Sequence, residues 1–425
     1  MRVQGGQECK FYPRDTLCGP GAKLGYARET RNSMPMIRTI VASSLLVFAS
    51  ASLTLLTAEY ILRLAMPDSY YVWPPKLSRI FQPAEGLMPG IEGNARFIVN
   101  EAGLRGDPLP DDLRPQLLAI GGSTTESIYL DQTETWPQLL QQKLGTEDLP
   151  VWVGNAGKAG TSSRHHVLQI EKLLDQHPTV STVVMLVGVN DLNTRLTEDE
   201  AYQPLPYKEY SANPGIVQRA FSRYPAGRLH GIHLRDTVIW HRLKQLGLIL
   251  FPPNTMQDSK GEMVLNWRRF RREAETIIRV LPAMDSALAE YRANIGRIVE
   301  IAKAHKVRII LLTQPAVWRP DLPPALSQLL WFGWKGNPFE KPASTYYSVG
   351  AMASGMRRFN DALMTVCGAY SVECIDLARS LPKDTRTFYD DFHFNENGAR
   401  QVATIVAGYL RENPQGKDQE FVGSY

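Results

Sequence analysis

The stretch QLLAIGGSTTE, residues 116–126, passes from an apolar run through two glycines into a serine. A short run of aliphatic residues is typical of a strand that is buried in a parallel sheet. Glycine permits a tight turn and close backbone approach, and Thr124, Thr125 and Glu126 suit the first turn of a helix. Ser123 is therefore expected at the carboxyl end of a strand, with its hydroxyl exposed and its backbone N–H free.

The same alternation continues along the chain. Further apolar runs that indicate strands occupy residues 151–153, 182–187, 307–312 and 372–375. Segments with helical periodicity occupy residues 136–144, 163–176, 283–305, 349–366 and 395–410. Strands that alternate with helices predict an α/β fold with helices on both faces of a parallel sheet. Ligands bind beyond the carboxyl ends of such strands, so motifs that follow the strands should converge on one edge.

Three more short motifs follow in a fixed order. They are NAGKAG at residues 155–160, GVND at 188–191 and DDFH at 390–393. The first two come directly after predicted strands, where they can supply donors to the oxyanion of an acyl-transfer reaction. The candidate donors are the backbone N–H of Ser123, a glycine N–H within residues 155–160 and the side-chain amide of Asn190.

His393 is the candidate base for the serine. A serine hydroxyl is a weak nucleophile at neutral pH and needs a base to accept its proton. Asp390 precedes His393 by three residues, so a single turn brings its carboxylate to the ring and fixes the tautomer. His165 and His166 are rival bases, but their helical pattern and the lack of a similarly spaced carboxylate favour a structural role.

These blocks, in this order, resemble the SGNH (GDSL-type) hydrolase family over roughly residues 116–410. The resemblance implies a flavodoxin-like three-layer α/β/α sandwich. It also implies that Ser123 is the nucleophile and that His393 is the base, with Asp390 behind it. The implied oxyanion donors are Ser123, Gly160 and Asn190. Gly122 stands where the family motif has Asp, which bears on subfamily placement more than on the nucleophile.

The net positive charge of the chain lies near its N-terminus. Residues 1–38 carry seven Arg and Lys against three Asp and Glu, which accounts for the whole formal net charge of +4. The rest of the chain has no basic excess, so we expect no nucleic-acid partner. No Cys and His cluster has metal-ligand spacing, and we expect no metal or cofactor. Cys367 and Cys374 can pair if the domain is exported, and two unpaired thiols are the alternative.

An apolar stretch at residues 37–58 is long enough to span a bilayer as a helix. Arg and Lys precede it more densely than they follow it, which leaves the N-terminus in the cytoplasm and the body outside. We therefore predict a transmembrane anchor over residues 37–65. The alternatives are a cleaved signal peptide and a buried core helix. Residues 1–36 are interpreted as disordered or as an over-extended gene start.

The remaining organisation follows from composition. Residues 66–116 are rich in Pro, Gly and aromatic residues and are interpreted as a tether. A hydrolase domain is predicted over residues 117–412, with a flexible tail at 413–425. Insertions at 193–282 and 318–347 interrupt it, and either shape a substrate cleft or elaborate the surface. The basic run at 268–272 is interpreted as the solvated face of a helix.

Three functions remain open from the sequence. The first is an exported, membrane-anchored serine esterase that hydrolyses acyl esters, with O-acetyl groups on carbohydrate as a candidate substrate. The second is an O-acyltransferase that uses the same residues on a periplasmic or extracellular glycan. The third is a non-catalytic binding protein. Three tryptophans of the second insertion are candidates either to stack on sugars or to belong to the core: Trp318, Trp331 and Trp334. The oligomeric state does not follow from the sequence.

Overall fold

The computed structural model describes residues 34–65, 69–112, 114–224, 259–336 and 344–414, together with positions 237, 239, 240 and 243. The chain divides into two compact units, Met1–Ala58 and Glu59–Tyr425. The interpretations of residues 1–33 and 415–425 lie outside the described residues. Helix α1 (Met34–Ala65) begins three residues before the predicted anchor.

Helix α1 is the one described helix that is long and apolar enough to cross a membrane. Its span Arg38–Leu62 has a mean hydropathy of 2.0, and none of the most apolar window is buried. A bilayer core needs about 20 apolar residues in a helix, so α1 exceeds the required length. This length and composition fit a membrane anchor and a signal sequence equally, and the exposure argues against a core helix.

A five-stranded parallel sheet forms the centre of the larger unit. Its strands are β3 (Gln116–Gly121), β4 (Trp152–Asn155), β5 (Val180–Leu186), β7 (Arg308–Leu312) and β9 (Glu373–Ile375). Their order is β4-β3-β5-β7-β9, and every neighbouring pair is parallel. This is the flavodoxin-like order, in which the chain changes direction between the first and third strands. The predicted α/β fold is confirmed.

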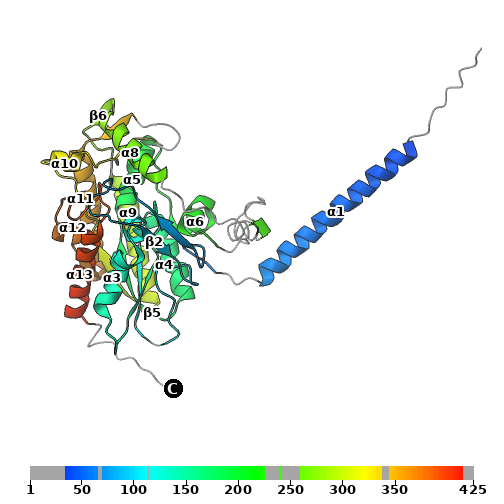
Figure 1. Cartoon of the computed structure of the whole chain (residues 1–425), viewed down its shortest axis with the longest axis horizontal. Coiled ribbons are helices and arrows are strands. Elements are labelled where there is room, and N and C mark those ends of the chain that lie inside the picture. The colour runs from blue at the N-terminus through cyan, green and yellow to red at the C-terminus, as the bar shows by residue number, and fades with distance from the viewer. Residues whose placement is uncertain are drawn as a thin grey trace, which may run out of the picture. The chain divides into compact units, whose positions relative to one another are not determined.

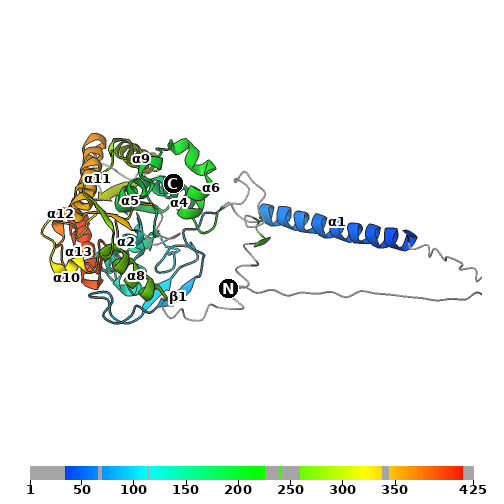
Figure 2. The same ribbon diagram turned by 90° about the horizontal axis from the view of Figure 1, so that it is seen from above.

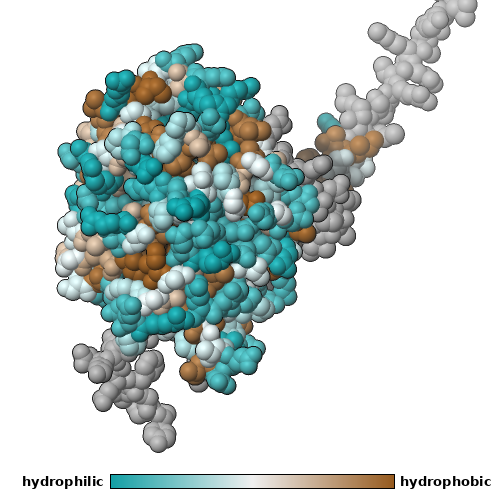
Figure 3. Space-filling view, turned by 60° about the vertical axis from the view of Figure 1, so that its left-hand side comes forward, coloured by the Kyte–Doolittle hydropathy of each residue, from teal (hydrophilic) through white to brown (hydrophobic). Residues whose placement is uncertain are grey.

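Helices cover both faces of the sheet (Figures 1 and 2). On one face, α3 (Trp136–Leu144) packs against α13 (Glu396–Glu412). On the other face, α9 (Asp285–Ala304) packs between α4 (Ser163–Gln176) and α11 (Val349–Tyr370). Leu118, Val184 and Ile310 are almost fully buried between these layers. Figure 3 shows that hydrophilic residues predominate on one face of the molecule, with apolar atoms in smaller patches.

Shorter elements complete the described structure. They are α2 (Ser123–Glu126), α5 (Val189–Glu198), α6 (Pro214–Ala220), α8 (Ser259–Arg272), α10 (Pro324–Ser327) and α12 (Leu377–Ser380). The 3-10 segments are Gln132–Glu134, Asp199–Ala201 and Tyr207–Ala212. Strands β6 (Thr276–Ile278) and β8 (Thr345–Tyr347) pair in parallel, which ties the first insertion to the second.

The segment before the sheet contains an antiparallel pair, β1 (Ser78–Phe81) and β2 (Ala95–Ile98). Phe81, Met88 and Phe97 of this segment join a second apolar cluster. Arg105, which is fully buried, donates hydrogen bonds to the carbonyl oxygens of residues 126, 127 and 130. Arg105 therefore braces the turn that follows Ser123, a role that the irregular composition of this segment did not predict.

The interpretation of the basic run as a solvated face is wrong for two of its arginines. Arg268 is 4% exposed and donates to the carbonyl oxygens of Leu87 and Tyr389. Arg271 donates to the carbonyl oxygens of residues 332 and 347. Arg269 and Arg272 are exposed, as predicted. Buried carbonyl groups need donors, and a guanidinium supplies several in one side chain.

A disulfide joins Cys367 near the end of α11 to Cys374 in β9, with their Cα atoms 6.2 Å apart. It closes the turn that leads from this helix into the edge strand. Disulfides persist in oxidising compartments and are rare in the cytosol. The pair therefore agrees with an exported domain.

Candidate active site

Ser123 is the first residue of α2 and follows the tight turn at the end of β3. It is partly exposed, whereas the residues around it are buried. The first N–H groups of a helix have no partner within the helix, so the Ser123 N–H is available to a ligand. The position matches the sequence-based expectation.

A chain of hydrogen-bonding contacts runs from Ser123 to an acid. The Nε2 atom of His393 lies 2.8 Å from the Oγ atom of Ser123. The Nδ1 atom of the same ring lies 2.7 Å and 3.0 Å from the two carboxylate oxygens of Asp390. The three side chains come from the start and the end of the domain, and the sheet edge brings them together.

Asp390 is held as an anion. It is 3% exposed, and its Oδ1 atom accepts the backbone N–H groups of Phe392 and His393 at 3.1 Å and 2.9 Å. Its Oδ2 atom accepts the indole N–H of Trp331 at 2.9 Å. Burial raises the pKa of Asp390, but the charge of His393 and the hydrogen bonds from His393 and Trp331 lower it below its ordinary value.

Aromatic rings enclose the imidazole of His393. The rings of Trp331 and Tyr389 lie nearly parallel to it, with centroids at 6.4 Å and 5.4 Å. Trp331 is itself stacked with Trp267 of α8 and with Trp334. These contacts limit the orientations that the imidazole can adopt. They also bring both insertions to the site.

Asn190 is the second residue of α5, in the first turn after β5 ends at Leu186. Its side-chain nitrogen donates one hydrogen bond to the Thr161 carbonyl oxygen at 2.8 Å, and an amide nitrogen carries a second N–H. A Cβ atom on Gly122 would lie 2.5 Å from this nitrogen. Glycine at position 122 therefore lets Asn190 approach the turn that carries Ser123.

Gly160 has a φ of +73°, a conformation that favours glycine. A Cβ atom there would lie 2.8 Å from an Nη1 atom of Arg219. Gly160, Ser123, Asn190 and His393 all line one cleft of about 1010 Å³. The structure thus brings the predicted oxyanion donors and the predicted base to the same cavity.

The loop that carries Gly160 is fastened to the turn of Ser123. The side-chain amide of Asn155 donates to the Thr125 carbonyl oxygen at 2.8 Å and its oxygen accepts the Gly157 N–H at 2.8 Å. A Cβ atom on Gly157 would lie 2.2 Å from the Glu126 backbone nitrogen. Residues 155–157 therefore pack closely against the turn that carries Ser123, and Gly160 lines the cleft.

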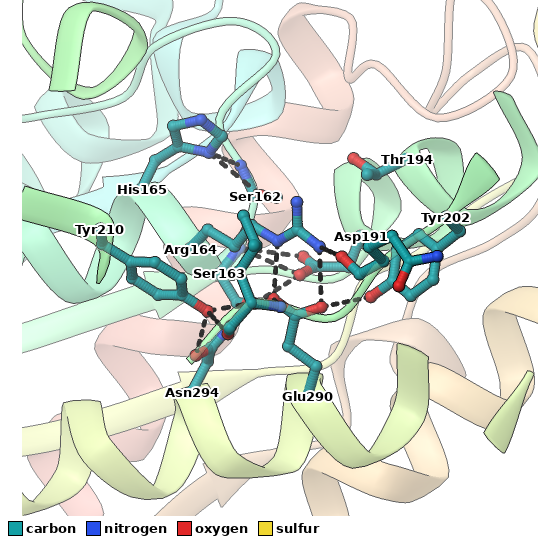
Figure 4. A network of polar contacts seen from close by, with 12 residues as sticks. Ser162, Ser163, Arg164, His165, Asp191, Thr194, Tyr202, Tyr210, Glu290 and Asn294 are labelled. Atoms are coloured by element: carbon teal, nitrogen blue, oxygen red, sulfur yellow. Dashed lines mark hydrogen bonds and ion pairs between the residues drawn. The ribbon is translucent and has the colours of Figure 1, made fainter. Parts of the chain in front are cut away.

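A polar network fixes the neighbouring helices (Figure 4). Arg164 of α4 forms an ion pair with Glu290 of α9, at 2.6 Å between Nε and Oε1. Asp191, next to Asn190, accepts the backbone N–H and the hydroxyl of Ser163. Burial raises the pKa of Asp191 to about 7, against the effect of the Ser163 hydrogen bonds. The network holds the start of α5, and with it Asn190, against α4.

The rival histidines have other partners. His165 lines the cleft, but its Nδ1 atom bonds to the backbone N–H of Ser162 at 2.9 Å. His166 is buried and lies 2.8 Å from the side-chain oxygen of Gln169. Burial lowers the pKa of His165 to about 3 and that of His166 to about 4. Both rings are therefore neutral at physiological pH, whatever their role.

Sequence reasoning missed Arg105 and Tyr389 as supports of the site, and gave Trp331 a different role. No local motif marks them, because their function depends on contacts across the fold. Trp318 and Trp334 are 2% and 4% exposed, which favours the core alternative for Trp318, whereas Trp334 also lines the cleft. Among the described residues, no group of three or more His, Cys, Asp and Glu side chains could hold a metal ion.

The sequence matches the model of the GDSL-like Lipase/Acylhydrolase family over residues 119–401. No curated protein matches the chain. A similar solved structure is the lipase/acylhydrolase from Enterococcus faecalis, with 13% identity, 70% of this chain and 96% of that chain covered, and a TM-score of 0.35. Another is Est24, a carbohydrate acetylesterase from Sinorhizobium meliloti, with 9% identity, 70% and 99% covered, and a TM-score of 0.37.

Proposed function

The chain belongs to the GDSL-like lipase/acylhydrolase family, and on this basis we propose that it is a serine ester hydrolase acting through Ser123, His393 and Asp390. The observation that carries the proposal is the continuous line of contacts from the Ser123 hydroxyl through the His393 ring to the Asp390 carboxylate. This is the arrangement that activates a serine and orients its base.

In the proposed mechanism, His393 accepts the hydroxyl proton while the Ser123 oxygen attacks the ester carbonyl carbon. The tetrahedral intermediate collapses when its bond to the alcohol oxygen breaks, and His393 returns the proton to that oxygen. Water then attacks the acyl-serine while His393 accepts a proton from it. The bond to the Ser123 oxygen breaks, His393 returns the proton to that oxygen, and the free acid is released. Asp390 stays ionised throughout and stabilises the imidazolium.

The negative charge that develops on the carbonyl oxygen needs donors that are already in place. We assign this role to the backbone N–H groups of Ser123 and Gly160 and to the free amide N–H of Asn190. Their common position on the cleft supports the assignment. An assay of ester hydrolysis by the purified protein, with and without a sugar acceptor, tests the proposal. Product on the acceptor instead of free acid would support the acyltransferase alternative.

The Asn190→Ala variant is expected to have a kcat lower by about 10²–10³-fold with little change in KM, because the amide binds the oxyanion and not the ground-state carbonyl. Steady-state kinetics on a soluble ester measure both parameters. A rise in KM at constant kcat would instead place Asn190 in ground-state binding.

We further propose that α1 anchors the protein and that its catalytic unit lies outside the cytoplasm. The apolar span, the Arg and Lys residues before it and the disulfide support this. A reporter that functions only outside the cytoplasm, fused after Tyr425, is expected to be active. Activity of a cytoplasm-only reporter at the same position would refute the proposed topology. Soluble protein with a mature N-terminus near Ser52 or Glu59 would support a cleaved signal peptide.

A further inference from the structure

The lining of the cleft is polar on the side of some elements and apolar on the side of others. Helices α4, α5 and α6, with the residue before α6, contribute polar side chains, among them Arg164, Asn193, Thr194, Thr197, Asn213 and Arg219. The N-terminal segment and α8 contribute mainly apolar ones. We refer to five of the latter as the apolar part of the cleft: Leu77, Phe81, Met88, Met263 and Val264.

The apolar part of the cleft is continuous with the candidate active site. Phe81, Met88 and Val264 belong to the second apolar cluster, which also contains Tyr129 and Tyr389, and Leu77 packs against it. Met263 lines the same cleft. Tyr389 stacks on the ring of His393, and Tyr129 lies on the turn that follows α2. An apolar group bound beside these residues would therefore reach the bond that Ser123 attacks.

The leucine, methionine and valine side chains of this part offer no hydrogen bonds. A sugar hydroxyl that is moved from water onto such a surface loses its partners, whereas an alkyl chain gains from leaving water. The cleft volume of about 1010 Å³ also exceeds what an acetyl group needs. Leu77, Phe81 and Met88 precede the family match, which begins at residue 119. Part of the apolar surface thus comes from a segment that precedes the hydrolase domain in the sequence.

We propose that the apolar part of the cleft binds an alkyl chain of the substrate, which is an amphiphilic ester that joins a chain of several carbons to a polar group. The inference rests on the proposed ester hydrolysis at Ser123. The polar lining from α4, α5 and α6 then faces the polar group. The alkyl chain belongs either to the acid or to the alcohol of the ester.

The test compares esters of increasing chain length, with the full-length protein in lipid nanodiscs and each ester below its micellar concentration. Each added methylene that is buried should raise kcat/KM by up to about fourfold. Chromogenic hexanoate should therefore be hydrolysed at least about tenfold more efficiently than acetate. The isomers ethyl hexanoate and hexyl acetate place the same chain on the acid or on the alcohol, so the faster of them identifies its source.

Two variants, each with a matched control, test where the alkyl chain of the ester binds. Met263→Glu on α8 and Leu77→Glu before β1 introduce a charge into the apolar part, and the ratio of hexanoate to acetate kcat/KM should fall toward one. The matched controls are Leu265→Glu on α8 and Ile80→Glu in β1, whose side chains are 53% and 40% exposed. Both controls should keep the rates and the ratio of the parent. Circular dichroism verifies that each variant is folded.

The outcomes separate this inference from the proposed function. Hydrolysis that depends on Ser123 but is as fast with acetate as with hexanoate would overturn the alkyl-chain site alone. An unchanged ratio in folded Met263→Glu and Leu77→Glu would overturn it as well. Absence of hydrolysis for every ester would overturn the proposed function, and the inference with it.

Discussion

Ser123→Ala is expected to abolish ester hydrolysis, with kcat lower by roughly 10⁴-fold or more, while the protein stays folded. The variant removes the oxygen that forms the acyl-enzyme and leaves the backbone N–H in place. Ser123 is partly exposed at the start of a short helix, so loss of its hydroxyl creates no large cavity in the core. The measurement is the rate of acid release under saturating ester, together with the thermal midpoint.

A matched control separates a chemical effect from a general one. Ser380→Ala removes an exposed serine hydroxyl of α12 that bonds to the Asp376 carbonyl oxygen. Its activity should equal that of the parent. If folded Ser123→Ala keeps a rate close to the parent, the serine-esterase account fails.

The second large effect is expected for Asp390→Asn, which should lower kcat by about 10²–10⁴-fold. The pKa of Asp390 lies below its ordinary value, so the carboxylate is ionised at neutral pH. Its negative charge stabilises the imidazolium that forms when His393 accepts the Ser123 proton, and the neutral amide of asparagine cannot do so. Initial rates over a range of ester concentrations measure kcat.

Trp331→Phe tests the hydrogen bond that the indole donates to Asp390. The phenylalanine keeps a ring in the stack but cannot donate to the Oδ2 atom of Asp390. The carboxylate then loses one of the contacts that orient it, so kcat should fall, but by less than in Asp390→Asn. Trp267→Phe changes another ring of the same stack and should keep the kcat of the parent. His165→Ala and His166→Ala should also keep it. A folded His165 or His166 variant as inactive as His393→Ala would refute the assignment of the base.

Much of the fold could be predicted because its helices and strands show a regular local spacing of apolar residues. The helices predicted at 136–144 and 163–176 match α3 and α4 residue for residue. In α3 the Thr135 hydroxyl accepts the Gln138 N–H, and Pro137 occupies the first turn, where its missing N–H costs nothing. The strands were located within two residues because their aliphatic runs are bounded by glycine and polar residues.

The elements that were missed depend on distant partners. The pairing of β6 with β8 joins segments that are almost 70 residues apart, and each strand has three residues and no alternating pattern. The sequence analysis predicts no helix over residues 189–198, where α5 lies, although Asp191 favours a helix N-terminus. The burial of Arg268 follows from carbonyl groups at positions 87 and 389, which no nearby sequence reveals.

The candidate site was more predictable than its surroundings. Ser123, Gly160, Asn190, Asp390 and His393 follow strands or precede a helix, and the parallel sheet places all such positions at one edge. The supports of the site come from segments with irregular composition. Trp331 and the N-terminal apolar residues belong to this class, because packing across the fold and not local pattern determines their positions.

The central claim, that Ser123 is the nucleophile, is tested most directly by mass spectrometry after reaction with a fluorophosphonate. Such a reagent forms a stable bond with an activated serine oxygen and releases fluoride. The account predicts one adduct, on Ser123, that appears as activity is lost and forms far more slowly in His393→Ala. Complete inactivation with the adduct on another residue and with Ser123 unmodified would contradict it.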